Sequence, residues 1–190
     1  MSNVTPAGQP PAGGTLARAY VAGVERAVDF IGRTASWLTL VIVVLMAISV
    51  LLRYGFSIGS VWAQELEWHL LAPLVLLGMT YALQKGEHVR VDVFYARYSP
   101  RGQAFVDLVA ALLAIAMAGL VIRYSIQFVT QSYVINEISN DPGGLTHRWM
   151  LKALIPVGFA VFALQASAQA VAAALRLRHP SGIDAPRFES

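Results

Sequence analysis

The sequence predicts an all-α integral membrane protein with four transmembrane helices and an amphipathic interfacial helix ahead of the first span. Two observations carry this prediction. Of the 190 residues, 56% are hydrophobic and only 13% are charged, far from the balance of a soluble domain. In addition, residues 34–52 and 153–175 contain no ionisable side chain, and each stretch can cross about 30 Å of hydrocarbon.

The chain is expected to form one membrane domain between two tails. Residues 1–14 are rich in Pro, Gly and small polar residues and are predicted to be disordered. A membrane domain over 15–176 is followed by a cytoplasmic tail over 177–190. The four spans are expected at about 34–52, 61–83, 105–130 and 153–175. The first apolar run begins after a mixed-charge segment and has the length of a full span, so we expect it to remain in the mature protein.

An amphipathic segment precedes the first span. Its apolar residues recur at helical spacing: Leu16, Tyr20, Val24, Val28 and Ile31. Charged residues occupy the rest of the surface, which is typical of a helix on the membrane face. The alternative is that this segment simply extends the first span into water.

The distribution of positive charge predicts the orientation. Ten of the 14 Lys and Arg residues fall on one side: Arg18, Arg26, Arg33, Lys85, Arg90, Arg97, Arg101, Arg176, Arg178 and Arg187. By the positive-inside rule, both termini and the loop 84–95 of this multi-pass protein are expected to be cytoplasmic. Because the net charge of +3 is spread by loop and not gathered on one face, no nucleic-acid partner is expected.

Ionisable residues within the spans lie near the span ends. Glu65, Glu67 and His69 are at the outer end of the second span, and Asp107 is at the inner end of the third. A chain that moved ions alone would be expected to place carboxylates or broken helices near the midplane. The chain also has no cysteine, which excludes disulfides, thiolate metal sites and iron–sulfur ligation. We expect neither an enzyme nor a cofactor.

Two cofactor sites are alternatives to a structural role for the residues at the outer end of the second span. Glu65 and His69 share a helix face at i and i+4 and could hold a metal with a third ligand. His69 and His147 could serve as haem ligands in a four-helix bundle. The favoured interpretation is that Glu65 or Glu67 pairs with an outer basic group such as Arg53, in this chain or in a partner.

The loop Gln84–Tyr95 concentrates charge between two apolar runs. Its potential metal ligands are Glu87, His88 and Asp92, but Lys85 and Arg90 compete for them in a solvated loop. Alternating valines at 89, 91 and 93 indicate an interfacial segment with apolar groups toward the bilayer. No metal site is predicted here.

Small and amide side chains mark candidate helix contacts. Small residues recur at every fourth position as Ala110, Ala114 and Ala118, and again as Ala166, Ala170 and Ala174. Such ladders allow close approach of helices in lipid. Gln165 and Gln169 share a face of the fourth span and are expected to hydrogen-bond between helices.

The order of several motifs resembles a known family. These motifs are Arg53, Trp62-Ala-Gln-Glu65, Leu77-Gly78 and Gly86-Glu-His88-Val-Arg-Val-Asp92, followed by two more spans. The pattern covers about 33–175 and resembles the small membrane subunit of tripartite ATP-independent periplasmic (TRAP) transporters, the DctQ-like family.

The resemblance implies an accessory role in a three-part secondary transporter. Its partners would be a large membrane subunit on a separate chain and a periplasmic substrate-binding protein, with Na⁺-coupled uptake of an organic acid. Structural roles would fall on Arg53, Trp62, Glu65, Gly78, Gly86, His88 and Asp92. The rival functions are an autonomous four-span channel or carrier, and a haem-binding redox subunit.

Overall fold

The computed structural model describes residues 12–86, 95 and 97–178, and in this part of the chain it contains four long helices and no strand. In chain order they are α1 (Ala12–Phe56), α2 (Val61–Lys85), α4 (Pro100–Val134) and α5 (Trp149–Arg178). Each is long and apolar enough to cross a membrane. The predicted all-α fold with four spans is confirmed.

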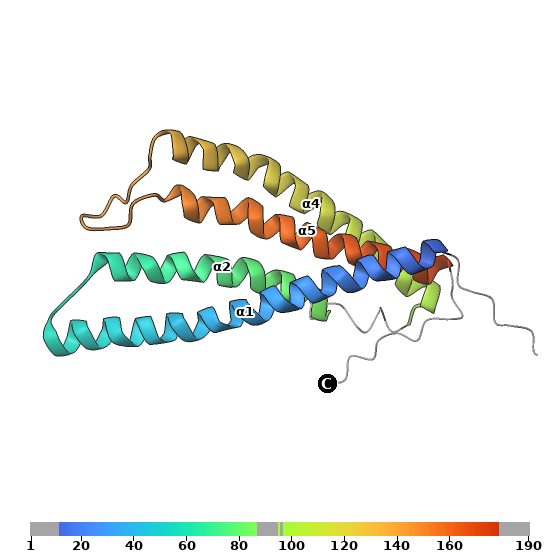
Figure 1. Ribbon diagram of the computed structural model, residues 1–190, viewed down its shortest axis with the longest axis horizontal. Coiled ribbons are helices and arrows are strands. Elements are labelled where there is room, and N and C mark those ends of the chain that lie inside the picture. Colours follow the sequence, from blue (N-terminus) through green and yellow to red (C-terminus); the bar gives the residue numbers. More distant parts are fainter. Residues whose placement is uncertain (1–11, 87–94, 96, 179–190) are drawn as a thin grey trace, which may run out of the picture.

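The helices form two hairpins that join through α2 and α5. α4 packs along α5, α1 packs along α2, and α5 contacts both α1 and α2. At one end, which holds the connections 57–60 and 135–148 and is called the hairpin end here, the order is α4, α5, α2, α1 (Figure 1). At the opposite end, called the terminal end, α1 crosses toward α5 and both described chain ends lie together (Figure 1).

α1 is one continuous helix that includes the segment expected to lie on the membrane surface. Val24 and Val28 of that segment are buried with Ala168 of α5, and Val21 and Val161 pack around them. Its apolar stripe therefore packs against a neighbouring helix. The structure corresponds to the alternative in which the segment extends the first span.

The other helices begin and end at residues whose local chemistry favours those positions. Ser60 caps α2 by accepting a hydrogen bond from the Ala63 amide, and Ser99 caps α4 ahead of Pro100. Gly86 ends α2 with a φ of 74°, a conformation that glycine adopts without a Cβ penalty. α4 continues to Val134, so the connection between α4 and α5 consists of residues 135–148 only.

The α4–α5 pair is joined along a seam of small side chains. The buried residues of α4 are Ala104, Ala111, Ala118, Ser125 and Ser132, which recur every seven residues. A strict seven-residue repeat keeps one stripe facing the partner helix, as in left-handed coiled coils. Small side chains at each position let the two backbones approach closely.

Candidate functional site

At the hairpin end, Glu65 of α2 binds the connection between α4 and α5. The Ser139 hydroxyl donates to one carboxylate oxygen and the Leu145 amide donates to the other, with the latter N···O distance at 2.5 Å. Gly144 lies against this contact, because a Cβ there would be 2.8 Å from Glu65 Oε2 and would also collide with Ser139. Glu65 therefore joins the two hairpins and requires glycine at position 144.

A second polar cluster supports the base of the same connection. Lys152 of α5 forms an ion pair with Glu137, and its Nζ lies 3.9 Å from the centroid of the Phe128 ring. The hydrogen bond from Lys152 lowers the pKa of Glu137 below the ordinary glutamate range. The rings of Tyr133 and Trp149, which lie on either side of the connection in the sequence, pack edge to face with their centroids 5.3 Å apart.

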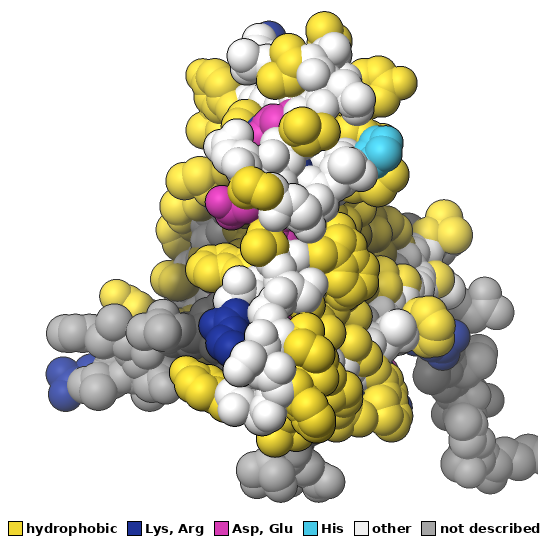
Figure 2. All heavy atoms as spheres, turned by 90° about the vertical axis from the view of Figure 1, so that its left-hand side faces the viewer, with side chains coloured by type: hydrophobic (Ala, Val, Ile, Leu, Met, Phe, Trp, Pro, Cys, Tyr) yellow, Lys and Arg dark blue, Asp and Glu magenta, His cyan; other side chains and the backbone are white. Residues whose placement is uncertain are grey.

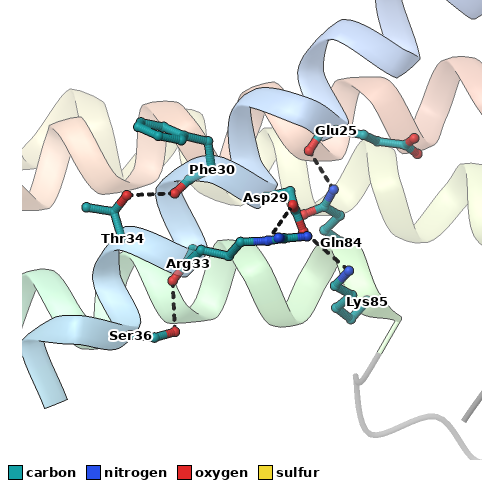
Figure 3. A network of polar contacts seen from close by, with 9 residues as sticks. Glu25, Asp29, Phe30, Arg33, Thr34, Ser36, Gln84 and Lys85 are labelled. Atoms are coloured by element: carbon teal, nitrogen blue, oxygen red, sulfur yellow. Dashed lines mark hydrogen bonds and ion pairs between the residues drawn. The ribbon is translucent and has the colours of Figure 1, made fainter. Parts of the chain in front are cut away.

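At the terminal end, charged groups join α1 to α2 (Figure 3). Asp29 accepts from Arg33 at 2.8 Å and from Lys85 at 3.4 Å, and the Gln84 amide donates to the Glu25 carbonyl at 2.7 Å. These bonds tie the last turn of α2 to the middle of α1. Because Arg33 and Lys85 are substantially exposed, the ion pairs orient the helices more than they stabilise them.

A further set of contacts ties the segment after α2 to α4 and α5. Asp107 of α4 accepts from the Tyr95 hydroxyl at 3.0 Å and pairs with Arg176 of α5 at 3.2 Å. The Gln169 amide donates to the Leu83 carbonyl at 2.7 Å, a carbonyl near the end of α2 that also accepts from the Gly86 amide at 3.3 Å. An ion pair and a hydrogen bond thus connect α5 with α4 and with α2.

The family-motif residues lie in several separate places. Arg53 and Trp62 are exposed at the hairpin end, and Arg53 makes no ion pair with any residue that the structure describes. Glu65 instead binds Ser139 and Leu145, and pairing of Glu67 with a basic group of a partner stays a prediction. A Cβ at Gly78 would meet nothing within 4 Å, so this glycine makes no close contact with another helix in residues 12–86 and 97–178. His88 and Asp92 lie outside the described residues.

The candidate helix contacts divide in the same way. Ala118 is fully buried in the seam, Ala114 is partly buried, and Ala110 is exposed. On α5, Ala166 is fully buried, while Ala170 and Ala174 are partly buried. The four-residue spacing therefore does not describe the α4 seam, whose repeat is seven because the helices coil around each other.

The two glutamines of α5 also differ. Gln169 hydrogen-bonds across to α2, as described above, whereas Gln165 is buried at 1% exposure. Its Oε1 has no hydrogen-bond donor among the residues that the structure describes. Gln165 thus occupies an interhelical position in which its Oε1 stays unpaired among the described residues.

The two histidines that the structure describes are engaged with residues near them in the sequence. His69 Nδ1 lies 2.7 Å from the Glu65 carbonyl of its own helix, while the Glu65 carboxylate turns to the connection. His147 is exposed and bonds to Thr146. Within residues 12–86, 95 and 97–178, no three His, Cys, Asp or Glu side chains gather as metal ligands.

Sequence reasoning missed the partners of Glu65 and Glu137. The turn at Asn140–Gly144 is visible in the sequence, but no local pattern relates it to a carboxylate on α2. From the hairpin end, hydrophobic side chains cover much of the flanks and the few acidic ones gather in the upper and middle part (Figure 2). The chemistry of these clusters is that of hydrogen bonding between helices and loops.

Comparison with known proteins places these features in a family. Residues 42–176 match the family model described as tripartite ATP-independent periplasmic transporters, DctQ component. A putative TRAP transporter small permease protein of Haemophilus influenzae is 32% identical over 62% of this chain and 76% of its own length. No solved structure matches this chain.

Two further relatives share only part of their length with this chain. The C4-dicarboxylate TRAP transporter small permease protein DctQ of Pseudomonas aeruginosa is 29% identical over 53% of this chain and 48% of its own length. The sialic acid TRAP transporter permease protein SiaT of Haemophilus influenzae is 27% identical over 66% of this chain and 20% of its own length. The four spans and these matches support a multi-pass protein of the inner membrane, in a family of transporter components. The chain belongs to the DctQ family and is a small permease subunit of a TRAP transporter.

Proposed function

We propose that this subunit is a non-catalytic scaffold that braces a separate large membrane subunit during Na⁺-coupled uptake of an organic acid. A periplasmic binding protein delivers that acid to the assembly. Both termini of the scaffold face the cytoplasm, as its distribution of Lys and Arg favours.

The observation that carries this proposal is the position of the polar groups. The stretches 34–52, 70–84, 108–122 and 153–175 contain no Asp, Glu, Lys, Arg or His, so charged side chains lie toward the ends of the bundle. Several of them connect one helix to another or to a loop, as Glu65 and Asp107 do. A subunit that carried the ion or the acid itself would need polar ligands at membrane depth.

The relation to SiaT supports the separate partner. The region similar to this chain makes up 20% of that permease protein. We infer that the large membrane partner resembles the remainder of SiaT. The named DctQ relative from Pseudomonas aeruginosa supports a C4-dicarboxylate or another organic acid as the transported class.

Structural roles are proposed for the family-motif residues. Glu65 fixes the hairpin end, Gly86 ends α2, and Gly78 offers an open surface to a partner. Arg53 and Trp62 are available for contacts outside the chain because both are exposed. For His88 and Asp92, ordering of the inner loop stays a prediction.

Reconstitution into liposomes tests this function. The small subunit alone, the large subunit alone and the two together with binding protein are compared for uptake of a radiolabelled C4-dicarboxylate under a Na⁺ gradient. We expect uptake only from the complete set, with a stable complex of the two membrane chains. Flux through the small subunit alone would favour an autonomous carrier, and a Soret band in the purified chain would favour the haem alternative.

A further inference from the structure

One face of α2 is largely left uncovered by α1 and α5, although its outer end shares a groove with the start of α5. Residues three or four positions apart share this face by helical geometry, and together they are called the free face of α2: Gln64, Glu67, Leu71, Val75 and Gly78. Leu71 and Val75 are 45% and 59% exposed. The opposite side of α2 carries the buried Thr80 and Leu83, so the free face is the part of the helix that the bundle leaves uncovered.

Glu67 is a carboxylate on this face without a partner in the described chain. It is half-buried, yet it makes no hydrogen bond or ion pair with any residue in the part that the structure describes. It lies about 27 Å along α2 from Lys85, close to the thickness of a hydrocarbon core. The exposed indole of Trp68 beside it suits the same interfacial depth. A carboxylate at this depth is stabilised by a cation.

Gly78 provides an unfilled notch in the same face. The glycines that face the inside of the bundle are used for close packing: a Cβ at Gly158 would lie 2.8 Å from Leu76, and one at Gly32 would collide with Tyr81. A Cβ at Gly78 would meet nothing within 4 Å. Glycine in a membrane span commonly allows another helix to approach. Among the helices that the structure describes, none takes that place.

The outer part of the free face opens into a groove of about 670 Å³. Gln64, Glu67 and Trp68 form one side of it, and Asp141, Arg148 and Leu151 form the other. Glu65 and His69 also line it, but the Glu65 carboxylate is bound to Ser139 and Leu145. Arg148 makes no ion pair with Glu67 or Asp141 among the described residues. The excess of carboxylates in the groove is complementary to a basic side chain.

We propose that the free face of α2 receives a membrane helix of the large subunit, with a Lys or Arg of that helix paired with Glu67. The partner backbone packs on Gly78, which lies about 25 Å along α2 from its first residue. A soluble protein resting on the hairpin end does not reach that depth. α2 is also the least hydrophobic of the four spans, which favours cover by protein over cover by lipid. The proposal rests on the scaffold function given above, since it names the surface that the large subunit occupies.

Co-purification from membranes tests the surface. The small subunit is co-expressed with a tagged large subunit, and the variants Gly78→Leu and Glu67→Lys are compared with Gly119→Leu. Gly119 is a matched control because it is exposed on α4 and a Cβ there would also meet nothing within 4 Å. We expect at least about a fivefold loss of recovered small subunit for both α2 variants and none for Gly119→Leu. Glu67→Gln should lose less than Glu67→Lys, because it removes attraction without adding repulsion.

The outcomes separate this inference from the proposed function. If the wild-type chains do not co-purify, the scaffold function itself fails. If they co-purify and the two α2 variants are recovered as well as Gly119→Leu, the free face is not the docking surface while the scaffold function stands. Unchanged elution and thermal stability of each variant by itself show that the losses arise from docking.

A labelling experiment covers the case in which Gly78→Leu does not fold. The chain has no cysteine, so Gln64→Cys and Gln131→Cys each introduce a single thiol at an exposed position toward the hairpin end. The large subunit should slow maleimide labelling at position 64 by about fivefold or more and leave position 131 unchanged. Equal labelling at position 64 with and without the large subunit would overturn the proposal.

Discussion

The two hairpins of the bundle are held together by different means. The α4–α5 pair packs along its length through a seven-residue repeat of Ala and Ser, and needs few polar groups between its helices. The α1–α2 pair has no described α1 residue buried beyond Ile42, and charged or amide groups fasten it at the terminal end. The difference indicates that α4–α5 is a self-sufficient unit, whereas α1–α2 leaves apolar surface for lipid and for a partner.

The largest loss of stability is expected from enlarging a buried residue of the α4–α5 seam. Ala118→Leu inserts three heavy atoms where exposure is 0%, so α4 must move away from α5. We expect the free energy of unfolding to fall by about 1–3 kcal/mol or more. Thermal unfolding of the full chain in detergent, followed by size-exclusion chromatography, measures the loss. Ala110→Leu is the control on the exposed side of α4 and should change the unfolding temperature little. Equal losses in the two variants would contradict the seam.

The next effect concerns the contact by which Glu65 joins the hairpins. Glu65→Gln retains an acceptor for Ser139 or Leu145 but removes the charge that both donors now share. We expect hydrogen exchange of residues 139–145 to accelerate several-fold while the α4 seam keeps its protection. Mass spectrometry of exchanged peptides reports both regions in one experiment. Glu67→Gln serves as the control, because Glu67 does not touch the connection in the described structure, and it should leave exchange at 139–145 unchanged.

Gly144 offers a second way to break the same contact. Gly144→Ala places a methyl group within 2.8 Å of Glu65 Oε2, so the connection must shift. We expect the exchange protection at 139–145 to fall as it does in Glu65→Gln. Gly143→Ala is a different substitution, because Gly143 has a φ of 81° but no neighbour within 4 Å, and its effect should come from backbone strain alone. A combined Gly144→Ala and Glu65→Gln chain should lose little more than either change alone.

The ion pair between Glu137 and Lys152 predicts a dependence on pH. Since the pKa of Glu137 is lowered in the folded chain, chiefly by the Lys152 hydrogen bond, the pair stabilises the fold above the ordinary glutamate pKa of about 4.3. That stabilisation is lost as the pH falls through the lower folded value. Lys152→Met keeps an apolar group near Phe128 but removes the charge. Its unfolding temperature should lie below that of the wild type at pH 7, and the gap should narrow toward pH 3. A gap that stays constant with pH would contradict the assignment.

The four spans could be predicted from the sequence alone, but the contacts between them could not. Charge-free stretches and cap residues such as Ser99 and Gly86 define helices locally, because length, hydropathy and backbone preference act within one segment. The partner of Glu65 depends on how two hairpins fold against each other, and its donors lie 74 and 80 positions away. The seven-residue repeat that marks the buried face of α4 was also present in the sequence. It was missed because the four-residue pattern that begins at Ala110 predicts a different contact face.

The smallest expected effect distinguishes the two glutamines of α5. Gln169→Leu removes the donor to the Leu83 carbonyl and leaves that carbonyl without this bond at the end of α2, which should cost about 1 kcal/mol. Gln165→Leu removes a buried Oε1 that has no donor among the described residues, so it should cost less and could stabilise the chain. Chemical or thermal unfolding in detergent compares the two variants directly. Because both substitutions place the same side chain on the same helix, their difference reports the hydrogen bond. A larger loss of stability for Gln165→Leu than for Gln169→Leu would contradict this assignment. It would mean that Gln165 has a polar partner inside the bundle and that the hydrogen bond from Gln169 to Leu83 contributes little.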